Sequence, residues 1–283
     1  MSLRKVQTSL AGVPTVEGAG VRLKRAFGHA QAPRFDPFLM LDDFHSSDPA
    51  DYLAGFPWHP HRGIETITYL LEGAVEHGDS MGNKGTISAG DVQWMTAGSG
   101  IIHQEMPKLS PTGTMWGFQF WANLPAARKM MPPRYQDVKA ADIPQVTLPG
   151  GVTAKVIAGM VAGVQGPVRD IVIDPEMLDV SVPAGTVYRH TLPEGHTAFV
   201  YILAGEASFD ESGESYRNET VLLFGHDGDG ISVETRREPA RFLLVSGRPL
   251  GEPVAWGGPI VMNTREELQL AFKEYEQGTF IKR

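Results

Sequence analysis

The chain contains no cysteine, which excludes disulfides, zinc–thiolate sites, iron–sulfur clusters and thiol nucleophiles. It also lacks any long basic run, and 25 Lys and Arg against 33 Asp and Glu leave a net charge of −8. Direct nucleic-acid binding is therefore not expected, because it needs clustered positive charge. No apolar run is long enough to cross a bilayer, and no signal-peptide pattern opens the chain. We expect a cytoplasmic protein that binds no membrane.

Turn-forming residues, in contrast, are abundant: 32 Gly and 21 Pro among 283 residues. Their sum is about a fifth of the chain, against a usual value near 12%, and no collagen-like period accompanies it. Short runs rich in β-branched and aromatic residues alternate with Gly and Asp turns about every ten residues. With 42% hydrophobic residues to fill a core, this pattern predicts an all-β protein of sandwich or barrel type.

Two series of such runs are present, separated by a proline-rich stretch from Leu124 to Gly151 without strand period. The segments TITYLLEGAVEH and AFVYILAGEASF share a shape, which indicates two copies of one β architecture. We expect domains at 1–140 and 141–283. One helix is predicted near the end, with Asn263 as its N-cap and Gly278 as its stop.

Histidine and glutamate gather in the first half, in WHPHRGIET and again in IIHQEMP. Side chains two apart on a strand share a face, so His59 pairs with His61 and His103 with Glu105. Glu65 joins the first pair if that strand continues. Adjacent strands would then bring three imidazoles and one or two carboxylates to one point. Such ligands suit Fe(II), Mn(II), Ni(II), Cu(II) or Zn(II), with positions left open for substrate or oxygen.

The other histidines show no such spacing. His29, His45 and His77 lie among turn residues, and we expect them in solvent. His190 and His196 stand where the second half would need its own metal motif, yet they are six apart and form neither HxH nor HxE. The second domain is therefore predicted to be metal-free and to serve packing, pocket closure or partner contact.

These motifs resemble those of the cupins and, more closely, those of the pirin family of two-domain cupins. The general cupin pattern is matched by the two histidines of HPH with Glu65 and Gly73, and then by three glycines and a histidine: Gly90, Gly98, Gly100 and His103. FPWHPHRG, LLEG, GDVQWMTAG and the terminal MNTREE are similar to pirin segments in more detail. The resemblance implies two tandem jelly-roll barrels with a short C-terminal helix.

The two patterns differ in one ligand, since many cupins use the glutamate that corresponds to Glu65. Pirins use two histidines of the first motif with a histidine and a glutamate of the second, which match His59, His61, His103 and Glu105. We follow the pirin pattern, which leaves Glu65 to orient a ligand imidazole. The expected ion is Fe(II), with Mn, Ni, Cu and Zn as alternatives.

The resemblance also implies an activity, because several pirins cleave the flavonol quercetin with O2 as 2,3-dioxygenases. Glu105 would accept the proton of the flavonol 3-hydroxyl, and the products would be carbon monoxide and a depside. Most aromatic residues of this half are expected in the core, with one or two against the substrate: Phe56, Trp58, Trp94, Trp116, Phe118 and Phe120.

A second hypothesis from the same resemblance is an iron-dependent, redox-sensing regulatory protein that binds a protein partner, as a transcription cofactor or as a regulator of a metabolic enzyme. The charge of −8 fits a protein partner better than DNA. Turnover beyond one equivalent would separate this hypothesis from the first. A cupin isomerase or sugar-binding protein is a third and weaker alternative. We expect a monomer.

Overall fold

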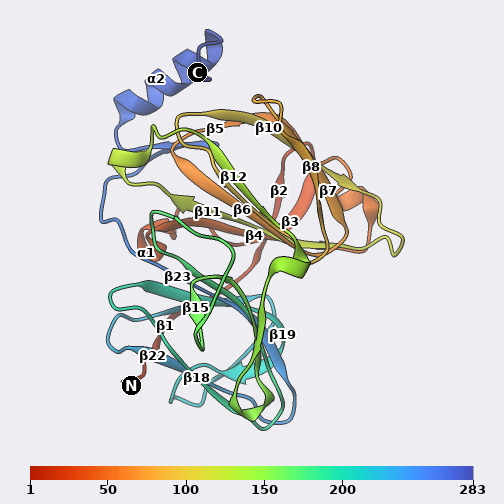
Figure 1. Ribbon diagram of the computed structural model, residues 1–283, viewed down its shortest axis with the longest axis vertical. Helices are drawn as coiled ribbons and strands as arrows, with labels where there is room; N and C mark the ends of the chain where they lie inside the picture. The colour runs from red at the N-terminus through yellow and green to blue at the C-terminus, as the bar shows by residue number, and fades with distance from the viewer. Residues whose placement is uncertain (283) are drawn as a thin grey trace. The chain divides into compact units, whose positions relative to one another are not determined.

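The structure is a computed structural model that describes residues 1–282 (Figure 1). Strands dominate it, which confirms the prediction of an all-β protein. Its α-helices are α1 (Ala32–Phe35) and α2 (Arg265–Glu276). Neither helix has the length and apolar character needed to span a membrane.

The chain forms two compact units. The first unit comprises residues 13–33, 38–140 and 250–282, and the second unit comprises residues 1–12, 34–37 and 141–249. This division differs from the single boundary near residue 140 that we expected. Residues 1–12 belong to the unit formed mainly by the second half of the sequence. Residues 250–282 belong to the unit formed mainly by the first half.

The first unit holds a seven-stranded sheet in the order β12-β9-β6-β11-β4-β3-β2 and a four-stranded sheet in the order β5-β10-β7-β8. A small third sheet pairs β24 with β25. The strands of this unit are β2 (Val13–Glu17), β3 (Val21–Phe27), β4 (Phe38–Ser46), β5 (Phe56–His61), β6 (Ile64–Glu72), β7 (Ala74–Asp79), β8 (Lys84–Ser88), β9 (Val92–Thr96), β10 (Ile101–Lys108), β11 (Met115–Asn123), β12 (Arg134–Val138), β24 (Ala255–Gly257) and β25 (Ile260–Met262).

The second unit is a ten-stranded sheet with the path β1-β21-β19-β23-β17-β14-β13, to which β18, β20 and β22 attach through β19 and β22. A two-stranded sheet pairs β15 with β16. The strands of this unit are β1 (Val6–Ala11), β13 (Gln145–Thr147), β14 (Thr153–Ala158), β15 (Met160–Val161), β16 (Val164–Gln165), β17 (Glu176–Val182), β18 (Val187–Thr191), β19 (Thr197–Ser208), β20 (Ser215–Arg217), β21 (Thr220–Phe224), β22 (Gly230–Glu234) and β23 (Ala240–Gly247).

Strand pairing explains why the N-terminus joins the second unit. Strand β1 pairs antiparallel with β21, from Val6 opposite Phe224 to Ala11 opposite Thr220. Figure 1 shows β1, in red, among the blue and green strands of that unit. The edge of β21 would otherwise expose unpaired backbone groups, so this pairing satisfies them.

A buried arginine explains why the C-terminal helix joins the first unit. Arg62 is 2% exposed. It donates to the carbonyl of Ser99 at 2.7 Å and to that of Phe280 at 2.7 Å, and it pairs with Glu274 at 2.7 Å. A buried charge needs such partners, so α2 and the residues after it are fixed to this unit. The helix that we assigned to the second domain therefore belongs to the first.

Helix α2 itself follows the prediction with a shift of one residue at its start. Its N-cap is Thr264, not Asn263: the Thr264 hydroxyl accepts from the backbone N–H of Glu267, whose carboxylate accepts from the N–H of Thr264. This reciprocal capping box satisfies two backbone donors that lack helical partners. Gly278 follows the helix with a φ of 70°.

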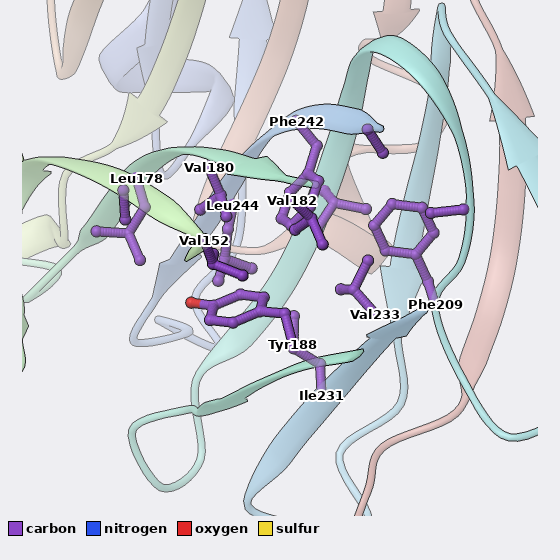
Figure 2. Close-up of a cluster of buried hydrophobic side chains, with 14 of the residues drawn as sticks. Val152, Leu178, Val180, Val182, Tyr188, Phe209, Ile231, Val233, Phe242 and Leu244 are labelled. Atoms are coloured by element: carbon purple, nitrogen blue, oxygen red, sulfur yellow. The ribbon is translucent and has the colours of Figure 1, made fainter. Parts of the chain in front are cut away.

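The interior of the second unit is filled with apolar side chains (Figure 2). They come from several strands, among them Val180 of β17, Phe242 of β23 and Val233 of β22. Figure 2 shows the Tyr188 ring packed beside Val152 in this cluster. This close packing makes burial of apolar surface the main source of stability of the unit.

Candidate metal centre

Three imidazoles converge inside the first unit. Strand β5 carries His59 and His61, and β10 carries His103 directly opposite His59 in the antiparallel pair. The ligand atoms of the three rings all lie within 4.8 Å of one another. The pairing of β5 with β10 therefore brings together residues some forty positions apart, as strand parity predicted.

Backbone carbonyls fix the tautomers of two of these rings. His59 Nδ1 lies 2.8 Å from the carbonyl oxygen of Pro57, and His61 Nδ1 lies 3.0 Å from that of Pro259. A carbonyl oxygen can only accept, so each Nδ1 carries the hydrogen and donates it. The lone pair of each neutral ring is then on Nε2, which is the arrangement that carbonyl partners impose on metal-bound histidines.

The two Nε2 atoms are only 3.0 Å apart. In neutral rings with hydrogen on Nδ1 both atoms are acceptors, so this approach is unfavourable unless a cation lies beside them. Two nitrogens in adjacent positions around an ion, each about 2.1 Å from it, would be separated by about 3 Å. The observed spacing therefore fits a shared metal ion.

His103 gives a second sign that this group of side chains suits a metal ion. Its side chain is 1% exposed, and neither Nδ1 nor Nε2 has a hydrogen-bond partner. Buried polar atoms are nearly always satisfied, because an unsatisfied one costs about 1–3 kcal/mol. A bond from one nitrogen to a metal would offset part of this cost.

Burial also keeps the imidazoles uncharged. Desolvation lowers the pKa of His59 and His103, and it lowers the pKa of His61 to about 3, with neighbouring imidazoles adding to the shift for His61 and His103. Only neutral imidazole binds a metal. At neutral pH, protons therefore compete little for these three ligands.

Glu105 lies on the same buried face of β10 as His103, in agreement with strand parity. Thr68 Oγ1 lies 3.1 Å from Glu105 Oε1 and can donate to it. Burial raises the pKa of Glu105 to about 7. The carboxylate is not one of the groups within 4.8 Å of one another, so its role as fourth ligand stays a prediction.

Glu65 does not share the site, because the strand does not continue through it. Gly63 separates β5 from β6 with a φ of 77°, and a Cβ there would collide with the carbonyl of Val261. Glu65 instead lies in the seven-stranded sheet, where Trp94 Nε1 donates to it at 3.0 Å and Thr96 Oγ1 at 2.6 Å. Both carboxylate oxygens are used in this way, and neither bonds to a ligand imidazole.

A cavity of about 650 Å³ opens beside the imidazoles. His59, His61 and Glu105 line it. Its aromatic walls include two of the residues named from the sequence, with two others that sequence reasoning missed: Phe56, Trp58, Trp121 and Trp256. Trp121 packs against His61 and Trp256, with its ring centroid 5.1 Å from that of His61 and 5.9 Å from that of Trp256.

The remaining predicted aromatic residues point elsewhere. Trp94, Phe118 and Phe120 are at most 2% exposed and belong to the core, as expected. Trp116 stacks on His45, with ring centroids 4.4 Å apart. None of these four lines the cavity.

One expectation about the other histidines is wrong. His77 is buried, not solvated, and it lies opposite Glu105 in the pair of β7 with β10. The turn residues around it concealed a strand whose alternate side chains, Val75, His77 and Asp79, are buried. His29 and His45 are exposed.

His190 of the second unit is also buried, but its ring is satisfied. Nε2 lies 2.6 Å from Glu176 Oε1, and Nδ1 lies 3.0 Å from the hydroxyl of Tyr188. His196 Nδ1 lies 3.3 Å from the Ser246 hydroxyl. The contacts of His190 use both of its ring nitrogens, and the group of histidines that could hold a metal ion among the described residues lies in the first unit.

Three residues near the site were missed from the sequence. Thr68 and Gln119 face Glu105 from neighbouring strands, and Gln119 could have been found as a polar residue alternating with aromatic ones in GFQFW. Pro259 contributes a backbone carbonyl. No side-chain pattern identifies such a contribution from 198 residues away.

Comparison with known proteins places these features in a family. The family model described as Pirin matches residues 20–122, and the one described as Pirin C-terminal cupin domain matches residues 177–281. The "Pirin-like protein" of Caulobacter vibrioides is 45% identical over 281 residues, which cover 99% of this chain and 100% of that protein. "Pirin-like protein 2" of Arabidopsis thaliana is 45% identical over 269 residues, covering 93% and 81%.

Among solved structures, a quercetin 2,3-dioxygenase from Acinetobacter baumannii superposes with a TM-score of 0.90 at 32% sequence identity. The match covers 99% of both chains. The similarity therefore extends over both units, and it confirms the architecture of two cupin domains.

Proposed function

Because the chain belongs to the pirin family, we propose that it is a metal-dependent dioxygenase that cleaves a flavonol such as quercetin. The observation that carries the proposal is the pair of Nε2 atoms 3.0 Å apart, with the unpartnered His103 beside them, at one end of an aromatic cavity. The quercetin 2,3-dioxygenase from A. baumannii, similar over 99% of its length, supports the same activity.

The four residues His59, His61, His103 and Glu105 would hold one divalent ion, for which we propose Fe(II). When bound, the ion would supply Lewis acidity and a route for electrons between substrate and O2. Three neutral imidazoles with one carboxylate suit several divalent ions, since none of these ligands is a thiolate. The second unit would hold no ion, because its His190 already bonds to Glu176 and Tyr188.

Glu105 is the proposed proton acceptor for the 3-hydroxyl of the flavonol. Each carboxylate oxygen offers two lone pairs, so the group can serve as ligand and still accept a proton. Thr68 donates to Oε1 and fixes the rotation of the carboxylate. The carboxylate is buried at the wall of the cavity.

The cavity walls explain the choice of a flat aromatic substrate. Phe56, Trp58, Trp121 and Trp256 offer ring faces and edges against which such a substrate can pack. A volume of about 650 Å³ lies within the usual range for small-molecule sites, about 300–1,000 Å³. These walls would also exclude water from the reacting carbon atoms.

The test is O2 consumption by anaerobically Fe(II)-loaded protein on addition of quercetin, with carbon monoxide measured as product. We expect many turnovers in the wild type and none in His61→Ala. His190→Ala serves as matched control, because it removes a buried imidazole from the unit that is proposed to hold no metal.

Absence of turnover with iron demonstrably bound would contradict the dioxygenase proposal. That result would favour the regulatory alternative, in which the oxidation state of the ion alters binding of a protein partner. Binding partners recovered with Fe(II) but not with Fe(III) would then identify that role.

A further inference from the structure

A row of polar side chains crosses the seven-stranded sheet of the first unit. Arg25 of β3 stands opposite Asp42 of β4, Asp42 opposite Gln119 of β11, and Gln119 opposite Thr68 of β6. Directly opposite residues of antiparallel strands point to the same side of the sheet. The row is therefore continuous on one face.

That face is the cavity face, because Arg25, Asp42 and Gln119 all line the cavity together with Glu105. Hydrogen bonds join the row at both ends. Arg25 donates from Nε and Nη2 to the two oxygens of Asp42, at 2.8 Å each. Thr68 Oγ1 lies 3.1 Å from both Gln119 Oε1 and Glu105 Oε1, and it can donate its one hydrogen to either. The row thus ends at the proposed proton acceptor.

The end remote from Glu105 carries more acceptors than donors. Arg25 Nη2 also lies 2.9 Å from Glu17 Oε1, so two carboxylates share one guanidinium. With both acids ionised, the charge of this group is about −1, which disfavours a carboxylate or phosphate on the ligand. A neutral hydroxyl can donate to these acceptors, and the Gln119 amide can serve as its second partner.

Strand spacing sets the separation of the two ends. Thr68 and Asp42 are separated by two strand intervals of about 4.8 Å each, or roughly 10 Å. An aromatic ligand whose oxidised ring lies at Glu105 would place a second, linked ring beside Asp42. The aromatic residues on the other walls hold such a molecule flat across the row.

We propose that Arg25, Asp42 and Gln119 form a second recognition end of the cavity, which binds vicinal phenolic hydroxyls on the substrate ring remote from the reacting one. The inference rests on the proposed function, since it assumes that the reacting ring lies at Glu105. It adds a preference that the proposed activity does not contain: polyphenols with a remote catechol are bound in preference to those without one.

The test compares three flavonols that differ only in the remote ring: quercetin with two hydroxyls, kaempferol with one and galangin with none. Binding is measured anaerobically on Fe(II)-loaded protein by quenching of tryptophan fluorescence, so no turnover is needed. We expect quercetin to bind about tenfold more tightly than galangin, because two further hydrogen bonds contribute. Kaempferol should lie between them.

The variant Asp42→Asn should bring the affinity for quercetin close to that for galangin and leave galangin within about twofold of its wild-type value. Glu17→Gln, at a more exposed carboxylate, should have the same effect to a smaller degree, and circular dichroism checks the fold of both. The wild-type series needs no variant. It therefore decides the question even if Asp42→Asn fails to fold.

Equal affinity of the wild type for all three flavonols would overturn the proposed recognition end and leave the dioxygenase proposal intact. An equal loss of affinity for all three in Asp42→Asn would overturn it too, since it would show a general effect on the cavity. If none of the three flavonols binds, both proposals are overturned together.

Discussion

The two units bury histidine in opposite ways. In the second unit, His190 bonds through both ring nitrogens, to Glu176 at 2.6 Å and to Tyr188 at 3.0 Å. In the first unit, His103 is more deeply buried, and neither of its nitrogens has a partner. A buried polar group must be satisfied by something. The comparison shows that hydrogen bonding, not the presence of histidine, distinguishes a structural imidazole from a candidate ligand.

The interiors around these histidines also differ: that of the second unit is filled, and that of the first contains a cavity. Apolar side chains fill the second unit around Tyr188 (Figure 2). The first unit keeps a cavity of about 650 Å³ with charged and aromatic walls. A filled core maximises stability, whereas an open cavity sacrifices packing for binding. The first unit is therefore where we place the chemistry.

Removing one imidazole from each unit tests this comparison most strongly. His103→Ala should weaken metal binding by more than about 100-fold, since changes to residues that merely orient ligands already cost 10–100-fold. His190→Ala should keep one metal per chain. Metal content after gel filtration measures both. Loss of metal from His190→Ala, or its retention by His103→Ala, would reverse the assignment of the two units.

Glu105 in the first unit and Glu176 beside His190 in the second are both buried carboxylates, and their amide variants give the next largest effect. Glu105→Gln should lower kcat about 100-fold or more and retain more metal than activity, because it removes the proton acceptor. Glu176→Gln should leave kcat unchanged. Steady-state O2 consumption and metal content decide the matter. Equal loss of metal and activity in Glu105→Gln would remove the evidence for a base.

Stability of the metal-free protein should depend on pH through Glu105. Its pKa is raised to about 7 by burial, from 4.5. The folded state then binds the proton more tightly than the unfolded state, so this stabilising contribution is complete below pH 4.5 and is lost as pH rises through 7. The shift corresponds to about 3 kcal/mol.

Urea unfolding of metal-free wild type and Glu105→Gln, between pH 4.5 and 8, isolates this contribution. The difference between the two proteins should change by about 3 kcal/mol over that range. Parallel pH profiles would show that the carboxyl is not desolvated. Bound metal should abolish the effect, since a cation favours the ionised carboxylate.

The smallest effect is expected in the second unit. Glu176→Gln replaces a buried carboxylate that lies 2.6 Å from His190 Nε2. A hydrogen bond to a charged group contributes about 1.5–3 kcal/mol, so the unit should lose about 2 kcal/mol of stability. Urea unfolding measures the loss, and Glu176→Asp gives a matched charged control. A stability equal to that of the wild type would show that the network contributes nothing.

The sequence predicted the convergence of the three histidines better than the cavity around them. His59, His61 and His103 follow from a two-residue period and the pairing of adjacent strands, both of which are local rules. Glu65 was harder to place, because Gly63 ends the strand and turns the chain into another sheet. Local periodicity carries no information beyond such a break.

Contacts between distant segments were not predictable in this way. Pro259 fixes His61 through a backbone carbonyl, and Arg62 holds Glu274 and Phe280 in the first unit. These contacts join residues about 200 positions apart, where no spacing rule applies. The C-terminal segment belongs to the first unit through these contacts, and the N-terminal strand belongs to the second through its pairing with β21. A single linear boundary could therefore not describe the two units.

The most direct test of the central claim is an anomalous difference map at the iron edge, from crystals grown anaerobically with Fe(II). The account predicts one peak per chain, bound by Nε2 of His59 and His61, by His103 and by an oxygen of Glu105, at about 2.0–2.2 Å. A peak beside His190 in the second unit, or a peak in which Glu105 takes no part, would contradict it.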